Sequence, residues 1–243
     1  MLRQILASAV IAGALAGIQV SGLQEIRVVP LILEAETYES AGEAANDAIS
    51  AAPAPHHHDM PAPTHHHVED IATTGSWAPE EGLERTFYTV LSNILTATAF
   101  ALLLTSCYAL AGHLDWRRGM LWGLAGFAVF HLAPSLGLPP EVPGSTAAPL
   151  YNRQAWWFGT VAATAGGLVL LVFHRENLFK LLGAALLVLP HLIGAPHPEL
   201  HGGLAPQELS SQYVVAALVT AGLFWVFLGA VSGFLFHRME DRE

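Results

Sequence analysis

Histidine is the residue whose placement in this chain most clearly offers chemistry, because 13 of the 243 residues are histidines and they are clustered. Two triplets lie in the tract HHHDMPAPTHHH, with a carboxylate beside the first triplet. Neutral imidazole nitrogens bind transition-metal ions such as cobalt, nickel, copper and zinc. The tract can therefore capture a divalent ion without a preformed cage, although neutral low-complexity drift is the alternative interpretation. Its candidate ligands are His56, His57, His58, Asp59, His65, His66 and His67.

Two further histidines, His131 and His191, lie in apolar segments at matching places. Each is followed by Leu and then by a segment that proline breaks, at Pro134 and Pro196. Broken helices free backbone carbonyls that can line an ion path, and ionisable residues inside a membrane usually face a cavity or a partner. We expect both histidines to be transient metal ligands, with a hydrogen bond to a neighbouring helix as the alternative.

The motif HPELH at 197–201 follows the second of these histidines. It places His197 and His201 four residues apart with Glu199 between them, but it does not have the HExxH spacing of zinc proteases. The neighbouring prolines and glycines disfavour a helix, so we interpret the motif as a metal-binding loop at the mouth of a membrane helix. Glu34 and Glu36 are further candidate ligands, although a solvated acidic surface explains them equally well.

The composition of the chain limits the class of protein to which these residues can belong. Hydrophobic residues make up 53% of the chain and charged residues 12%, against about 25% charged in an average soluble domain. The net charge is −10, from 10 basic and 20 acidic residues, so a soluble enzyme and a nucleic-acid-binding protein are both disfavoured. The single cysteine, Cys107, excludes an intrachain disulfide, and the single lysine, Lys180, follows no glycine-rich phosphate loop. We therefore expect no enzyme.

Six apolar stretches approach the roughly 20 residues that cross a bilayer. We predict an all-α integral membrane protein with about six transmembrane helices, or five if the first is a cleaved signal peptide or lies at the interface. The chain then divides into a first transmembrane helix at 1–24, an outer His-rich loop at 25–86 and a five-helix membrane domain at 87–243. The predicted spans are 5–24, 87–112, 119–138, 155–173, 178–195 and 213–236.

The basic residues indicate how these spans are oriented. Seven of the ten fall on the side that holds both termini and three on the other side, which predicts cytoplasmic termini in a multi-pass protein of the bacterial inner membrane. Fifteen of the 20 acidic residues fall on the outer side. The negative charge and the His-rich tract therefore share the face that metal ions would reach first.

The outer loop and the membrane domain each carry a further pattern. The centre of the loop, AGEAANDAISAAPAPHHHDMPAPTHHHVED, is low in complexity and predicts disorder, whereas its edges at 27–39 and 77–88 predict order at the membrane surface. In the membrane domain, FHLAPSLGLPPE and PHLIGAPHPE end two spans, and VFHRE and LFHRME end two others. These matches suggest a repeated hairpin at 119–175 and 178–238, such as transporters contain.

Motifs along essentially the whole chain resemble the predicted cobalt-transporter subunit family called CbtA. FHLAPSLGLPPE and LPHLIGAPHP are the most specific, and GLERTFYTVLSNILTATAFALLL and WWFGTVAATAGGL extend the resemblance. The resemblance implies cobalt uptake in bacteria whose cobalamin synthesis it serves, together with a small single-span partner, CbtB, that has its own histidines. The family is commonly described with about five spans rather than six, which leaves the first span and the side of the N-terminus open.

We therefore expect membrane transport of a divalent transition metal, with cobalt implied by the resemblance and no tightly bound cofactor. The outer tract would raise the local ion supply, and the histidines within the membrane would bind the ion weakly enough to release it inward. Two alternatives stay open: a membrane metal sensor or scaffold subunit, and a membrane protein that holds haem between two histidines. Besides the lipid bilayer and the CbtB-like subunit we expect no nucleic-acid partner.

Overall fold

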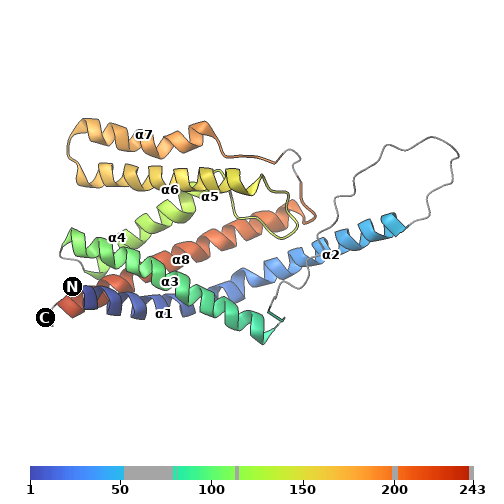
Figure 1. The fold of residues 1–243 in the computed structure, drawn as a ribbon, viewed down its shortest axis with the longest axis horizontal. Helices are drawn as coiled ribbons and strands as arrows, with labels where there is room; N and C mark the ends of the chain where they lie inside the picture. The colour runs from blue at the N-terminus through green and yellow to red at the C-terminus, as the bar shows by residue number, and fades with distance from the viewer. Residues whose placement is uncertain (52–78, 81, 113–114, 199–201, 241–243) are drawn as a thin grey trace.

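The computed structural model describes residues 1–51, 79–80, 82–112, 115–198 and 202–240, and these residues are almost entirely helical (Figure 1). A π-helix, η1, interrupts the helical stretch that follows α3, and one isolated antiparallel bridge joins two loops. The elements are α1 (Leu2–Arg27), α2 (Val29–Ala51), α3 (Leu83–Ala111), α4 (Trp116–Phe127), η1 (Ala128–Leu132), α5 (Ala133–Ser135), α6 (Leu150–Phe173), α7 (Asn177–Ile193) and α8 (Gln207–Glu240).

Four helices in the described part of the chain, α1, α3, α6 and α8, are long and apolar enough to cross a membrane. They correspond to the first, second, fourth and sixth predicted spans. Helix α7 is apolar but has only 17 residues, and the third predicted span is divided among α4, η1 and α5. Large apolar side chains such as Leu121, Val172 and Leu181 are exposed, as is expected of helices that contact lipid. The structure therefore confirms an all-helical membrane protein, while a count of six spans remains a prediction.

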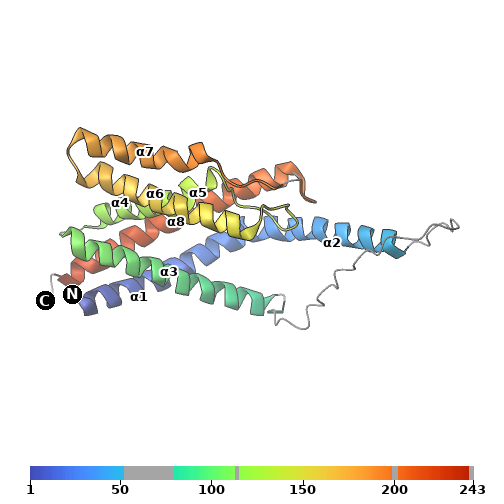
Figure 2. The same cartoon turned by 45° about the horizontal axis from the view of Figure 1, so that its top comes forward.

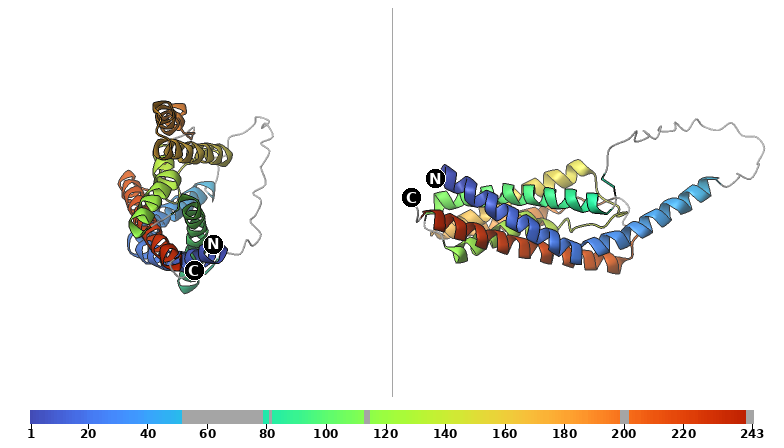
Figure 3. Two further views of the ribbon diagram at one scale, coloured as in Figure 1. Left: turned by 90° about the vertical axis from the view of Figure 1, so that its left-hand side faces the viewer. Right: turned by 90° about the horizontal axis from the view of Figure 1, so that it is seen from below.

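Both termini lie at the same end of the bundle (Figures 1 and 3). The connections from α3 to α4 and from α6 to α7 are at this terminal end, whereas α2 projects from the opposite end. We call the opposite end the loop end, because the connections from α5 to α6 and from α7 to α8 lie there. Figure 2 shows the same arrangement from a second direction, with α6 and α7 on one side of the bundle.

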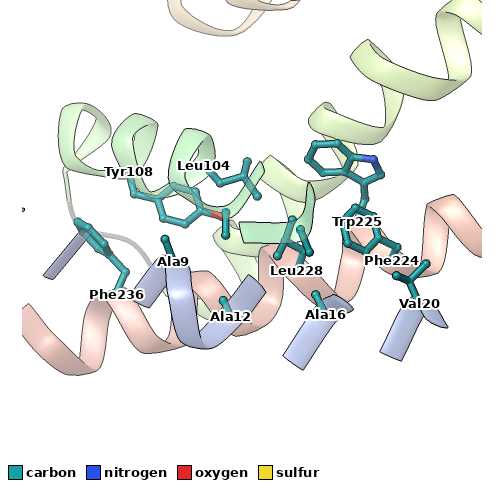
Figure 4. Packing of buried hydrophobic residues seen from close by; sticks show 12 residues of the cluster. Ala9, Ala12, Ala16, Val20, Leu104, Tyr108, Phe224, Trp225, Leu228 and Phe236 are labelled. Carbon is teal, nitrogen blue, oxygen red and sulfur yellow. The ribbon is translucent and has the colours of Figure 1, made fainter. Parts of the chain in front are cut away.

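Helices α1, α3 and α8 form the centre of the bundle, where small residues allow close approach (Figure 4). Ala9, Ala12 and Ala16 of α1 are fully buried in this cluster. Side-chain hydrogen bonds add to the packing: Gln4 Nε2 donates to the carbonyl oxygen of Phe236 at 2.9 Å. In a membrane, where lipid is as apolar as the side chains, close packing and such bonds drive helix association.

Glycines bring two other pairs of helices into backbone contact. A Cβ added at Gly233 of α8 would lie 2.9 Å from the Cα of Gly119 of α4, so only glycine fits there. The same holds between α6 and α7, where a Cβ on either Gly167 or Gly183 would lie 2.8 Å from the carbonyl oxygen of the other. The glycines of the predicted hairpins therefore pair α4 with α8 and α6 with α7.

Helix α2 occupies the start of the segment predicted as an outer loop, and this corrects one expectation. Residues 41–51 were expected to be disordered, yet α2 continues to Ala51. The reason is local, since this stretch is rich in alanine, the best helix former, and the first proline after it is Pro53. The predicted order at 27–39 agrees with α2, and the remainder of the low-complexity centre, 52–70, lies outside the described residues.

The loop end is held together by contacts between segments that are distant in sequence. Ala35 of α2 is fully buried against Val142 and Leu209, which belong to the loop before α6 and to α8. Glu36 of α2 forms an ion pair with Arg85 of α3 at 2.8 Å. These contacts position α2 over the loop end of the bundle.

The two loops of the predicted hairpins also contact each other at this end. Ser145 and Gly203 form the isolated bridge, and the backbone N–H of Thr146 donates to the carbonyl oxygen of Gly202 at 3.1 Å. The hydroxyl of Thr146 donates to the same oxygen. The connection from α5 to α6 is thereby fixed against the connection from α7 to α8.

Candidate metal site

His131 lies in the π-helix η1, inside the third predicted span. Pro134 has no backbone N–H and so cannot donate to the carbonyl of residue 130, four residues back. The N–H of Ala133 donates to the carbonyl of Ala128, five residues back, which is the spacing of a π-helix. A π-turn inserts one extra residue into a helix and frequently marks a functional position. The third predicted span, 119–138, is therefore a helix broken near Pro134, as expected, and its helical part ends at Ser135.

The π-turn presents His131 to α8. The indole Nε1 of Trp225 donates a hydrogen bond to His131 Nδ1 at 3.1 Å, and the two rings meet edge to face with 6.1 Å between their centres. The ring of Phe127, one turn earlier, stacks on the ring of His131 with 6.3 Å between their centres. His131 is half-buried. The structure contains the hydrogen bond to a neighbouring helix that was the alternative expectation for this residue.

His131 also lines a cavity of about 300 Å³ between α1, α3, η1 and α8. The cavity lies in the half of the bundle nearer the loop end, because it is formed by the last two turns of α1 and the first half of α8. Its apolar part includes Phe100 and Phe224. The polar residues around it, none of which is Asp, Glu, Lys or Arg, are Gln24, Asn93, Thr96, His131, Tyr213 and Thr220.

Two of these polar residues hold each other across the interface of α1 and α3. Asn93 Nδ2 donates to Gln24 Oε1 at 2.6 Å and to Ser21 Oγ at 3.0 Å. Both bonds use the amide nitrogen, so Asn93 Oδ1 takes part in neither of them. Imidazole nitrogen together with amide and hydroxyl oxygens is a donor set that accepts cobalt, nickel or zinc.

His191 occupies a different interface, between α6 and α7. Its ring lies edge to face with that of Trp156, with 6.1 Å between the centres. The indole Nε1 of Trp156 donates to the carbonyl oxygen of Pro190 at 3.3 Å rather than to a histidine nitrogen. His191 does not line the cavity that contains His131, and α7 lies at the edge of the bundle in the end-on view (Figure 3).

The other candidate ligands are placed as follows. His197 is exposed in the loop after α7, Glu34 is exposed on α2, and Glu36 is engaged by Arg85. Within the described residues, no group of three or more His, Cys, Asp or Glu side chains is arranged to hold a metal ion. The candidates outside the described residues are His56, His57, His58, Asp59, His65, His66, His67, Glu199 and His201.

Three polar residues of the cavity, Asn93, Gln24 and Thr220, do not stand out in the sequence. They are not ionisable, whereas ionisable groups inside a span are the most conspicuous sign of a site. A signal was present for one of them, since an amide side chain such as Asn93 inside an apolar span must find a partner when it leaves water. Trp225 could not be linked to His131 from the sequence, where the two are 94 residues apart.

Long apolar helices with exposed apolar side chains define the protein as a multi-pass α-helical membrane protein. A family model described as probable cobalt transporter subunit (CbtA) matches residues 2–237. The chain therefore belongs to this family, which is one of transporter subunits and not of enzymes, and the resemblance stated above is confirmed. No curated protein and no solved structure matches the chain.

Proposed function

We propose that this protein is the membrane subunit that carries cobalt(II) into the cell, and that the cavity beside His131 is a transient binding site on the path of the ion. The observation that supports this is the position of His131, an imidazole set by a π-turn at the wall of a cavity between membrane helices that both polar and apolar residues line. Cobalt comes from the family, whose description is a probable cobalt transporter subunit. The residues that line the cavity supply imidazole, amide and hydroxyl groups, and these donors suit several divalent metals.

The lining of the cavity suits transport better than storage. A tight structural site surrounds its ion with several anionic or imidazole ligands, whereas here one imidazole is combined with neutral oxygens. Conduction requires binding that is favourable enough for entry and weak enough for release. A volume of about 300 Å³ corresponds to about ten water molecules at roughly 30 Å³ each, so the ion can keep part of its hydration shell.

We further propose the route by which the ion reaches this cavity. The acidic and His-rich outer segment, with His56–His58, Asp59 and His65–His67, concentrates cations near the loop end. His197, Glu199 and His201 form the mouth, and His191 is a second transient ligand on the α6–α7 side. The excess of basic residues on the side of the termini supports cytoplasmic termini. We propose inward movement of the ion, toward cobalamin synthesis.

Energy and partners complete the proposal. A divalent ion that moves inward gains about 4.6 kcal/mol per 100 mV of membrane potential, at about 2.3 kcal/mol per charge. A CbtB-like single-span subunit would associate with the bundle within the membrane.

The alternative of haem held between His131 and His191 finds no support in the geometry, because the two rings face different tryptophans on different helices.

The test is uptake of radiolabelled cobalt into vesicles that contain the purified full-length protein, with and without the partner subunit. His131→Ala should lower the initial rate at limiting cobalt by about tenfold, the effect of losing about 1.4 kcal/mol of binding. His174→Ala is the matched control, because His174 is exposed at the terminal end after α6 and should leave the rate unchanged. An unchanged rate in both variants would show that the cavity is not on the path.

A further inference from the structure

The hydrogen bond between Trp225 and His131 has a consequence for metal binding, and the inference drawn from it rests on the proposed function. We propose that Trp225 is a positioning residue that holds His131 in a form with no nitrogen free for a metal ion. The ion can bind this ring only after the Trp225–His131 bond is broken. Occupancy of the cavity is thereby coupled to the packing of α4 against α8.

The first step concerns the lone pairs of the imidazole ring. An indole N–H is a donor only, so the atom that faces it, His131 Nδ1, must accept and carries no proton. In a neutral imidazole the single proton is then on Nε2. A metal ion needs a lone pair on one ring nitrogen. With Trp225 in place, the lone pair of Nδ1 is engaged and Nε2 is protonated.

Neither ring nitrogen can bind a metal ion while this bond persists. Coordination through Nδ1 displaces the indole directly. Coordination through Nε2 requires the proton on Nδ1, where it would face the N–H of Trp225 at a nitrogen–nitrogen distance of 3.1 Å. Two N–H groups cannot face each other at hydrogen-bond distance, so the indole or the imidazole must move in this case as well. The same conclusion holds whichever nitrogen meets the ion.

Trp225 is packed so that it cannot move alone. It is fully buried, and its ring centre lies 4.7 Å from that of Phe100 and 5.7 Å from that of Phe130, whose plane is parallel to within 2°. The edge of the indole fills the space beside Gly126, and the backbone carbonyl of Trp225 abuts Gly123. A displaced indole therefore disturbs the glycine-mediated contact of α4 with α8. Closely packed interfaces of this kind respond in discrete steps rather than continuously.

The α6–α7 hairpin supplies an internal comparison. Trp156 also lies edge to face with a histidine, His191, at the same centre-to-centre distance of 6.1 Å. Its N–H is directed to the carbonyl oxygen of Pro190 instead of to the ring. Removal of the Trp156 N–H should therefore leave the metal affinity of the cavity unchanged, whereas removal of the Trp225 N–H should not. Phe preserves the aromatic packing at both positions.

The first measurement reads the tautomer directly in a protein that keeps Trp225. The full-length protein, with the six tract histidines replaced by serine, is labelled with ¹⁵N-histidine and ¹⁵N-tryptophan, and the His131 and Trp225 signals are assigned by comparison with His131→Ala and Trp225→Phe. We expect a proton on Nε2 and none on Nδ1 in the metal-free protein. Zinc, a diamagnetic probe, should shift the indole N–H signal of Trp225 when it binds. A proton found on Nδ1, or an indole signal that zinc leaves unshifted, would overturn the proposal.

The second measurement is cobalt affinity by equilibrium dialysis on the same background. Trp225→Phe should tighten the His131-dependent Kd by about two- to tenfold, the range that one net hydrogen bond represents. Trp156→Phe should leave the Kd unchanged, and Trp225→Phe should have no effect when His131→Ala is also present. An unchanged Kd in Trp225→Phe, or equal tightening in Trp156→Phe, would contradict the role given to Trp225.

These outcomes separate the two proposals. If His131→Ala leaves cobalt binding and uptake unchanged, the cavity is not a metal site and both proposals fail. If His131→Ala weakens binding and uptake while Trp225→Phe changes neither the tautomer nor the Kd, the transport site stands and only the role of Trp225 is rejected.

Discussion

Gly167 of α6 and Gly183 of α7 face each other so closely that a Cβ on either residue would lie 2.8 Å from the carbonyl oxygen of the other. Gly183 precedes His191 by eight residues, as Gly123 precedes His131. Gly123 in turn meets the backbone of α8. In each half of the predicted repeat, therefore, a glycine fixes a helix against its neighbour, and a histidine follows near the loop end.

Gly183→Val should destabilise the protein by separating α6 from α7. The added side chain would meet the carbonyl of Gly167 and the side chain of Leu171, and overpacking of this kind costs about 1–3 kcal/mol. Thermal unfolding in detergent should show a lower Tm. Gly159→Val is the matched control on α6, because a Cβ there meets no heavy atom within 4 Å. Equal loss of stability in both variants would disprove the close contact.

Tyr108→Phe should lower stability through one lost hydrogen bond. The Tyr108 hydroxyl lies 3.1 Å from Ser232 Oγ and is buried between α3 and α8. Ser232 keeps a partner, since its hydroxyl also donates to the carbonyl of Leu228 at 2.6 Å, so the expected cost is only about 0.5–1.5 kcal/mol. The same measurement on Tyr151→Phe, where the ring is exposed, should show no change.

Asn93→Leu should reduce cobalt uptake by removing an oxygen from the cavity and releasing Gln24 and Ser21. We expect the rate at limiting cobalt to fall by about tenfold, as for a loss of about 1.4 kcal/mol. Ser92→Leu makes the same kind of change at an exposed position on the adjacent face of α3 and should leave uptake unaffected. Wild-type uptake in Asn93→Leu would remove Asn93 from the proposed site.

Deletion of residues 50–70 should distinguish transport from sensing. In a transporter, loss of the tract lowers the local supply of ions, so the half-saturating cobalt concentration rises while the maximal rate is retained. In a sensor, the deletion would abolish the response of the cell to cobalt. A dose–response series of cobalt uptake by cells that express the full chain or the shortened chain measures both quantities.

The membrane class could be predicted from the sequence because the cost of burying charge in lipid acts on every residue of a span separately. Long apolar runs such as 87–112 and 213–236 therefore predicted helices that the structure contains as α3 and α8. The family could be predicted because its most specific motifs, FHLAPSLGLPPE and LPHLIGAPHP, are contiguous in sequence. The helix at residues 41–51 was not predicted, because the low complexity of this stretch indicates disorder while its many alanines favour a helix.

By itself, the sequence determined that the chain crosses a membrane, and it predicted that its acidic and His-rich residues share one side and that His131 and His191 occupy matching places. Only the tertiary structure decided that the two histidines face different helices, and that Trp225, 94 residues away, holds His131 at the wall of a cavity lined by both polar and apolar residues. The physical reason is that hydropathy acts locally along the chain. A hydrogen bond between two helices depends on how the glycine-lined surfaces of α4 and α8 set their spacing and register.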